Sequence, residues 1–132
     1  MYGWNGKLLR VDLTKGKAVS QKYDAGFAKT FLGGRGFAAK ILWDRLGSKW
    51  ETTDPLGIRN ILLLLTGPLT GYFPGGRICV SGKSPQSNGV IGSTVAGEFG
   101  IDLKCAGYDG LIITGKAAKP SYIMIGENEG SI

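Results

Sequence analysis

Apolar and polar residues largely alternate in the segment Lys7–Leu13 near the N-terminus, and a second short segment, Lys17–Tyr23, follows it. Alternation with a period of two is typical of a half-buried strand, and the intervening Thr14-Lys15-Gly16 has the composition of a tight turn. We therefore predict a β-hairpin. Asp24 follows and is suited to cap a helix over Ala25–Phe31, because its carboxylate can accept hydrogen bonds from the free amides of the first turn.

The apolar spacing becomes helical after a glycine-rich interruption at Gly33–Gly36, where we expect a tight helix–helix turn. Phe37–Leu46 carries its apolar residues on one face, and Gly47 is placed to end the helix. A loop is expected over Trp50–Arg59. The continuous apolar run within Asn60–Leu65 predicts a strand that is buried on both faces.

The C-terminal half of the chain is expected to be mostly β-structure. Further strands are predicted at Arg77–Ser81, Val90-Ile91, Gly110–Thr114 and Ser121–Ile125, with one more helix at Glu98–Ala106. The chain shows no repeat or linker, so residues 1–132 are expected to form a single domain. We expect that domain to be incomplete, because no closing element is predicted after the last strand. The expected fold class is α+β, rich in strands, with two or three short helices.

Composition narrows the classes of function. The 132 residues carry 16 Lys and Arg against 10 Asp and Glu, and the formal net charge of +6 favours anionic partners. The cations are scattered, which argues against nucleic acid as the partner. Histidine is absent, which excludes a Ser-His nucleophile. Cys79 and Cys105 form no C-x-x-C pair, so we assign no metal site to side chains of this chain alone.

The N-terminal segment lacks an apolar core of signal-peptide length. The longest apolar run, Ile61–Leu65, is too short to span a membrane. Two isolated cysteines are also consistent with a reducing compartment, where they serve as small buried residues. We therefore expect a cytoplasmic protein with no membrane partner.

The segment Gly71–Gly100 is the most informative about chemistry. Glycine makes up 23 of the 132 residues, and here it is concentrated with Ser, Thr, Asn and Pro around two cations, Arg77 and Lys83. Accessible backbone amides beside fixed cations suit an anionic ligand that carries phosphate. Arg77 follows a diglycine and is either a clamp for such a ligand or an exposed surface arginine. Thr94–Gly100 is likewise either a ligand-facing loop or a simple chain reversal.

The sequence matches two phosphate-binding motifs in part, but neither of them in full. Gly34-x-Gly36-x-x-Ala39 has the letters of a dinucleotide fingerprint, but a predicted helix rather than a strand precedes it. Gly82-Lys83-Ser84 has the end of a P-loop, but an arginine stands where the first glycine of that loop is required. Asp109, which ends the segment Ala-Gly-Tyr-Asp, is expected to accept hydrogen bonds from turn amides and to serve the structure.

Six stretches are distinctive as an ordered set that runs over nearly the whole chain. They are Met1–Trp4 with Gly6–Leu13, Phe31–Gly36, Thr66–Gly71, Gly75–Arg77, Lys83–Pro85 and Lys104–Lys116. Together they resemble the N-terminal part of the tungsten-containing aldehyde:ferredoxin oxidoreductase family. Each stretch is short, but their order and separations make the resemblance specific.

The resemblance implies a pterin-cofactor-binding domain whose β-sheets embrace a tungsten or molybdenum ion. Two pterin dithiolene cofactors, tungstopterin or molybdopterin, hold that ion, and magnesium lies near their phosphates. The complete enzyme would carry a [4Fe–4S] cluster, oxidise aldehydes to carboxylic acids and pass electrons to ferredoxin. Cluster ligands and catalytic groups are expected in later domains, so this chain is expected to hold no catalytic residue. The alternative is a free-standing, non-catalytic pterin- or anion-binding module.

The resemblance also assigns site residues. The family's cofactor-binding arginine corresponds to Arg77, and its later Asn-x-Gly contact corresponds to Thr94-Val95-Ala96. Thr94 and Ala96 depart from the family residues, so we expect them to contribute backbone groups to cofactor binding. An incomplete domain would also expose an apolar face, which predicts self-association into a homo-oligomer.

Overall fold

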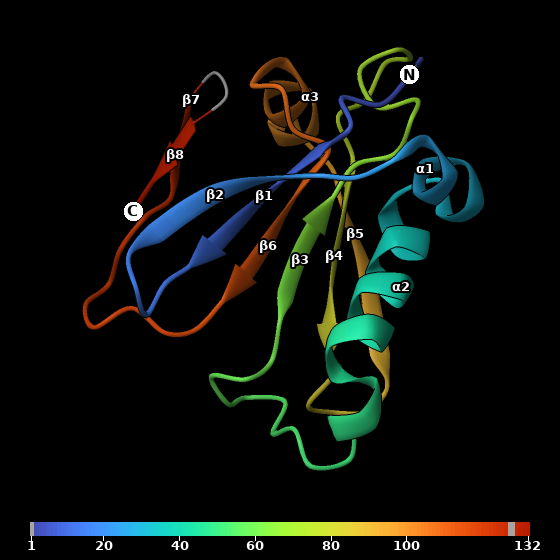
Figure 1. Ribbon diagram of the computed structural model, residues 1–132. Helices are drawn as coiled ribbons and strands as arrows, with labels where there is room; N and C mark the ends of the chain where they lie inside the picture. The colour runs from blue at the N-terminus through green and yellow to red at the C-terminus, as the bar shows by residue number, and fades with distance from the viewer. Residues whose placement is uncertain (1, 127–128) are drawn as a thin grey trace.

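The alternating N-terminal segments form the predicted hairpin, β1 (Lys7–Asp12) and β2 (Lys17–Lys22), in the computed structural model (Figure 1). The structure describes residues 2–126 and 129–132. Gly16 lies in the turn with a φ of 60°, which glycine adopts without steric cost. The hairpin forms one end of a six-stranded sheet with the order β2-β1-β6-β3-β4-β5.

Four more strands complete this sheet: β3 (Leu62–Leu65), β4 (Ile78–Lys83), β5 (Val90–Val95) and β6 (Gly110–Thr114). β1 and β6 are parallel, and all other neighbours in the sheet are antiparallel. β5 is longer than the predicted Val90-Ile91, because Gly92 interrupts the strand pattern in the sequence and pairing with β4 supplies the missing stabilisation. Strands β1 and β6, far apart in sequence, lie side by side in the sheet (Figure 1).

Two helices cover one face of the sheet, which we call the helix face. These are α1 (Ala25–Phe31) and α2 (Gly34–Leu46), and the 3-10 turn η1 (Gly47–Lys49) follows them (Figure 1). The predicted cap of α1 is confirmed, since the Phe27 amide donates to the Asp24 carboxylate at 2.7 Å. The core beneath the helices contains Leu8, Ala28, Phe37, Ala38, Ile41, Leu42, Leu46, Ile61, Leu63, Leu65 and Ile112.

The glycine-rich interruption before α2 belongs to the helix itself, which begins at Gly34 rather than at Phe37. Gly33 is the N-cap with a φ of 146°, and a Cβ on Gly36 would collide with the Phe31 carbonyl. Glycine therefore allows α2 to start directly against the end of α1. The two helices meet in a tight turn as predicted, but it consists of Leu32 and Gly33 and does not extend to Gly36.

The opposite face of the sheet, which we call the open face, is covered only in part. Helix α3 (Phe99–Cys105) and the hairpin of β7 (Met124–Gly126) and β8 (Glu129–Ser131) pack over its β1–β6 end. The core there contains Leu9, Val11, Leu103, Tyr108 and Leu111. Elsewhere the face is bare: Leu62 is 46% exposed, so the prediction that its strand is buried on both faces is wrong.

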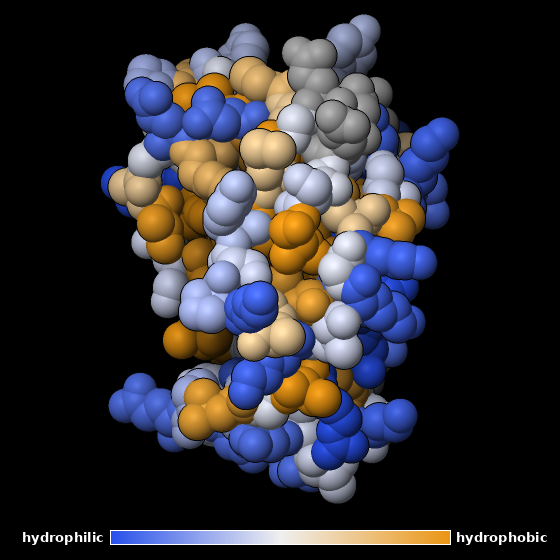
Figure 2. Space-filling view, turned by 90° about the vertical axis from the view of Figure 1, so that its left-hand side faces the viewer, coloured by the Kyte–Doolittle hydropathy of each residue, from blue (hydrophilic) through white to orange (hydrophobic). Residues whose placement is uncertain are grey.

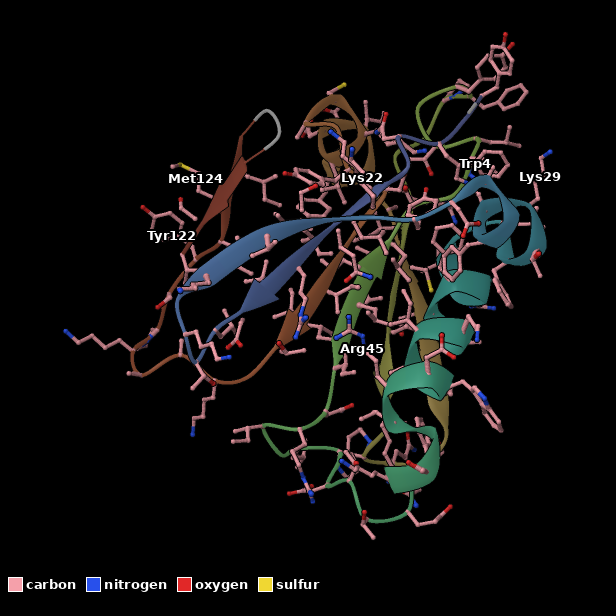
Figure 3. The ribbon with its side chains drawn as sticks, viewed as in Figure 1. Trp4, Lys22, Lys29, Arg45, Tyr122 and Met124 are labelled. Atoms are coloured by element: carbon pink, nitrogen blue, oxygen red, sulfur yellow. The ribbon has the colours of Figure 1, made fainter. Side chains whose placement is uncertain are left out.

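The last strand is shorter than predicted and begins at Met124, because its partner β8 pairs only from there onward. β8 itself was not predicted, and the expectation that nothing closes the last strand is wrong; residues 127–128 lie outside the described part of the chain. The side chains of Tyr122 and Met124 point away from the body of the molecule (Figure 3).

The side of the molecule turned away from α2 shows apolar side chains between charged and polar ones (Figure 2). The expected class, an α+β fold rich in strands with short helices, is confirmed. No helix within residues 2–126 and 129–132 is long and apolar enough to cross a membrane.

Candidate functional site

The residues predicted to bind a cofactor meet at one end of the β4–β5 ribbon. Ile78 pairs with Val95, so Arg77 and Ala96 stand opposite each other immediately beyond the paired strands. Thr94 lies on β5 two residues before Ala96, opposite Cys79. All three predicted residues are exposed. The hairpin register alone brings Arg77 and Ala96 together, although they are far apart in sequence.

The guanidinium of Arg77 has no hydrogen bond or ion pair to any residue that the structure describes. A free guanidinium offers a planar fork of N–H donors, the geometry that matches a phosphate or the edge of a heterocycle. The geometry of Arg77 is therefore compatible with a ligand clamp, because its donors are not used by the described residues.

The backbone groups of Thr94 face outward from the sheet. β5 is an edge strand, and in an antiparallel ribbon only every second residue bonds to the partner. The Ser84 amide donates to the Gly89 carbonyl at 2.8 Å, which sets this alternation. Residues 91, 93 and 95 therefore face β4, whereas residues 90, 92 and 94 direct their N–H and C=O groups away from it, and Ala96 continues the outward series.

Glycines on both sides of this end leave the backbone accessible. Gly75 has a φ of 125° and Gly97 a φ of 132°, and a Cβ built on either meets no atom within 4 Å. Both conformations favour glycine, and both open onto unfilled space. Gly76 differs, because a Cβ there would collide with the Gly97 carbonyl. The diglycine therefore combines one residue needed for close packing with one that keeps the site open.

Lys83 does not join this site. It is 2% exposed, and its ammonium donates to the carbonyls of Trp50 and of Thr53, the latter at 2.8 Å. The same ammonium lies 5.3 Å from the centre of the Trp50 ring. Lys83 thus ties down the loop before β3, and the interpretation of Lys83 as a cation for an anionic ligand is wrong.

Asp109 has the structural role predicted for it. The carboxylate is 2% exposed and accepts from the Gly6 amide at 2.8 Å, from the Tyr23 hydroxyl at 2.6 Å and from the Lys104 ammonium at 2.9 Å. Burial, and next the hydrogen bond to this carboxylate, raise the pKa of Tyr23 above its ordinary value. The cluster joins the N-terminal segment to the turn after α3, and Trp4 further joins that segment to α1 through the Leu32 carbonyl (Figure 3).

The described side chains offer no ready ligand set for a metal ion. No three His, Cys, Asp or Glu side chains come together in the part of the chain that the structure describes. Cys79 is buried and Cys105 is exposed, and both are free thiols. What the site offers is thus one guanidinium and the outward backbone groups of β5.

One further residue at this site was missed from the sequence. Arg35, the second residue of α2, donates through its guanidinium to the Gly92 carbonyl at 2.7 Å. Gly92 and Thr94 are alternate residues of the same edge strand, so Arg35 borders the predicted site. The only sequence signal was its place within the distinctive stretch Phe31–Gly36, where it was taken as part of a turn.

Comparisons with known proteins agree on the family. Residues 8–132 match the family model described as aldehyde ferredoxin oxidoreductase, N-terminal domain. An aliphatic sulfonate oxidoreductase, WOR-like subunit, from Pyrococcus furiosus is 55% identical over 95% of this chain and 20% of its own length. The tungsten-containing aldehyde ferredoxin oxidoreductases of Pyrococcus furiosus and Thermococcus kodakarensis are 42% and 40% identical, over 95% and 100% of this chain.

The fold is also similar to a solved structure, the active site complex BamBC of benzoyl coenzyme A reductase with 1,5-dienoyl-CoA. The similarity has a TM-score of 0.89 and 37% sequence identity, and it covers 98% of this chain and 20% of that one. The chain spans about a fifth of the length of these relatives. The family model, the relatives and the fold together show that this chain belongs to the aldehyde ferredoxin oxidoreductase family, in which it corresponds to the N-terminal domain.

Proposed function

We propose that this chain is the N-terminal, cofactor-binding part of a tungsten-pterin oxidoreductase. The observation that carries the proposal is the meeting of Arg77, Thr94 and Ala96 at one end of the β4–β5 ribbon, where the Arg77 guanidinium has no partner among residues 2–126 and 129–132. Relatives with 40% and 42% identity are named as tungsten-containing enzymes, which supports tungstopterin rather than molybdopterin as the cofactor.

The residues present fit such a group. Arg77 would donate to its phosphate or to the edge of its pterin, and the backbone of Thr94 and Ala96 would meet its polar edge. The open space at Gly75 and Gly97 would let a planar ring approach the main chain. When bound, the cofactor supplies the redox chemistry, while this chain binds it and holds its orientation. Magnesium near the phosphates and a [4Fe–4S] cluster held by other segments belong to the same proposal.

The proposed reaction is the oxidation of an aldehyde to a carboxylic acid, with ferredoxin as electron acceptor, as the names of the tungsten-containing relatives suggest. A second candidate substrate is an aliphatic sulfonate. It is favoured by the 55% identity to a subunit that is named for that substrate, a higher value than for the aldehyde enzymes. A non-catalytic pterin- or anion-binding module stays as the alternative.

The test uses the protein purified from cells supplied with tungstate. Tungsten is measured by elemental analysis and pterin by fluorescence of the released cofactor, for the wild type, Arg77→Gln and Arg59→Gln. Arg59 is a matched control, because it is an exposed arginine that donates to one backbone carbonyl, that of Thr52, away from the site. We expect Arg77→Gln alone to lose tungsten and pterin together. Equal content in all three proteins would refute the role of Arg77.

Substrate class is tested on the complete enzyme, in which this chain is joined to the later domains that would carry the cluster and the catalytic groups, by ferredoxin reduction with an aldehyde or with an aliphatic sulfonate. Turnover of the aldehyde alone supports the first candidate reaction, and turnover of the sulfonate alone supports the second. Bound pterin without turnover of either would favour the binding module.

A further inference from the structure

We propose that Arg35 is a second anion-binding side chain of this site, and that the site therefore accepts a ligand with two anionic groups, such as a diphosphate or a phosphate beside a second charge. The inference deepens the proposed function and rests on it, because it takes the outward edge of β5 as part of the binding surface. Nothing in the resemblance assigned a role to Arg35.

Arg35 is held in place by the strand it crosses. Its guanidinium donates to the Gly92 carbonyl at 2.7 Å. Its stem lies flat against the same residue, since a Cβ built on Gly92 would come within 2.9 Å of Nε and 3.2 Å of Cγ of Arg35. Glycine at position 92 is therefore the residue that lets this arginine lie on the edge strand. A side chain held at two points loses less freedom when it binds a ligand than a mobile one does.

Arg35 contacts the same edge strand that carries Thr94. Gly92 and Thr94 both direct their backbone groups outward, and alternate residues of a strand are about 6.5 Å apart. One phosphate group and the donors around it could therefore reach from Gly92 to Thr94. A ligand lying along the edge of β5 would thus meet Arg35 first, then Thr94, and Arg77 beside Ala96 at the strand end.

The charges at the site are not neutralised within the chain. The ion pairs of residues 2–126 and 129–132 are Lys15–Asp12, Lys40–Asp44 and Lys104–Asp109, and neither Arg35 nor Arg77 is among them. Arg35 uses one donor on Gly92, and the other N–H groups of its guanidinium have no partner among the described residues. One guanidinium lies on the edge of β5 and the other just before β4, at the end of the same ribbon, and neither has a carboxylate partner among the described residues. Two such groups favour an anion with more than one negative charge.

The competing explanation is purely structural. A charged side chain laid over an exposed edge strand prevents another strand from pairing with it, and Arg35 covers the one outward carbonyl at the centre of β5. Under this explanation Arg35 has no part in ligand binding. Its loss would then free the edge for association between copies of the chain.

The test measures binding of inorganic pyrophosphate by calorimetry to the wild-type chain and to Arg35→Gln, Arg77→Gln and Arg59→Gln, with circular dichroism to verify that each is folded. We expect Arg35→Gln and Arg77→Gln each to weaken binding by about tenfold or more, and Arg59→Gln to leave it unchanged. Arg35→Lys should recover part of the loss, because it restores the charge without the planar fork. Raised ionic strength should weaken the wild type more than either site variant.

The outcomes separate this inference from the proposed function. Unchanged pyrophosphate binding in Arg35→Gln, with a shift to dimers in size-exclusion chromatography, would overturn the inference and establish the structural explanation. Loss in Arg35→Gln but not in Arg77→Gln would remove Arg77 from the site and overturn the inference that two arginines bind the ligand together. Wild-type chain that binds no pyrophosphate also overturns the inference, whereas the role of Arg77 in tungsten retention is judged separately on the holoprotein.

Discussion

Asp109 and Arg77 both lie in distinctive stretches of the sequence, yet the structure uses them in opposite ways. Asp109 is 2% exposed and has its oxygens filled by an amide, a hydroxyl and an ammonium of the same chain. Arg77 is exposed and has none of its donors filled by the described residues. A buried charge whose partners lie within the chain maintains the fold, because leaving it unpaired costs free energy. An exposed charge without partners is left available for a ligand.

Lys83 belongs with Asp109 rather than with Arg77, although the sequence places it in the glycine-rich segment. Its ammonium is fully used by carbonyls and a tryptophan ring of the loop before β3. The comparison therefore predicts that substitutions of Asp109 and Lys83 change the free energy of unfolding, and that substitution of Arg77 changes ligand retention.

The largest effect is expected for Asp109→Ala. The change leaves the Lys104 ammonium, whose side chain is only 14% exposed, without its counter-ion and removes the acceptor for Gly6 and Tyr23. Breaking a buried ion pair costs about 3–5 kcal/mol of the free energy of unfolding, measured by urea denaturation. Glu51→Ala removes the same charge at an exposed position and is the control. An equal loss of unfolding free energy in Asp109→Ala and Glu51→Ala would contradict the structural role of the buried Asp109 carboxylate.

Lys83→Met should follow, with a loss of about 2 kcal/mol, because the carbonyls of Trp50 and Thr53 lose a charged donor while the apolar stem is kept. Hydrogen exchange of the amides of residues 51–59 should accelerate, since this loop loses its anchor. Lys119→Met, at an exposed position, is the matched control. Unaltered exchange in the loop would show that Lys83 is not its anchor.

Tyr23→Phe should cost about 1 kcal/mol at neutral pH and change the response to alkali. The pKa of Tyr23 is raised above its ordinary value of 10.0 by burial first and by Asp109 second. Since the folded-state pKa is the higher one, the related stability is present below the unfolded pKa and is lost as pH rises above it. Denaturation at increasing pH from about 9 to 11 should therefore destabilise the wild type more than Tyr23→Phe. Tyr122→Phe, 80% exposed, should behave like the wild type.

The smallest effect on stability is expected for Arg77→Gln, within about 0.5 kcal/mol, because the side chain has no partner to lose among the described residues. The same variant is the one expected to lose tungsten. A large loss of stability in Arg77→Gln would show that Arg77, like Asp109, maintains the fold, and would contradict the comparison.

Local features were predictable where a short segment holds both the cause and the effect. Alternation predicted β1, and the turn residues that follow it predicted its pairing with β2. The Asp24 carboxylate predicted the start of α1, and the apolar spacing predicted the body of α2. The length of β5 was not predictable, because Gly92 and Ser93 interrupt the strand pattern and are held in the strand by pairing with β4. Leu62 is exposed because α3 and the last hairpin cover only part of the open face. The extent of that cover cannot be predicted from the residues around Leu62.

The candidate site divides in the same way. Resemblance along the chain selected Arg77, Thr94 and Ala96, but the fate of each cation depended on contacts between distant segments. The Lys83 ammonium donates to the carbonyl of Thr53, 30 residues earlier in the chain. The Arg35 guanidinium donates to the carbonyl of Gly92, 57 residues later. Sequence by itself thus determined the family, the fold class and the chemistry on offer, because these follow from residue types and their spacing. Tertiary structure alone decided which charges are consumed by the fold and which stay free, because hydrogen-bond partners are assigned only when the chain has packed.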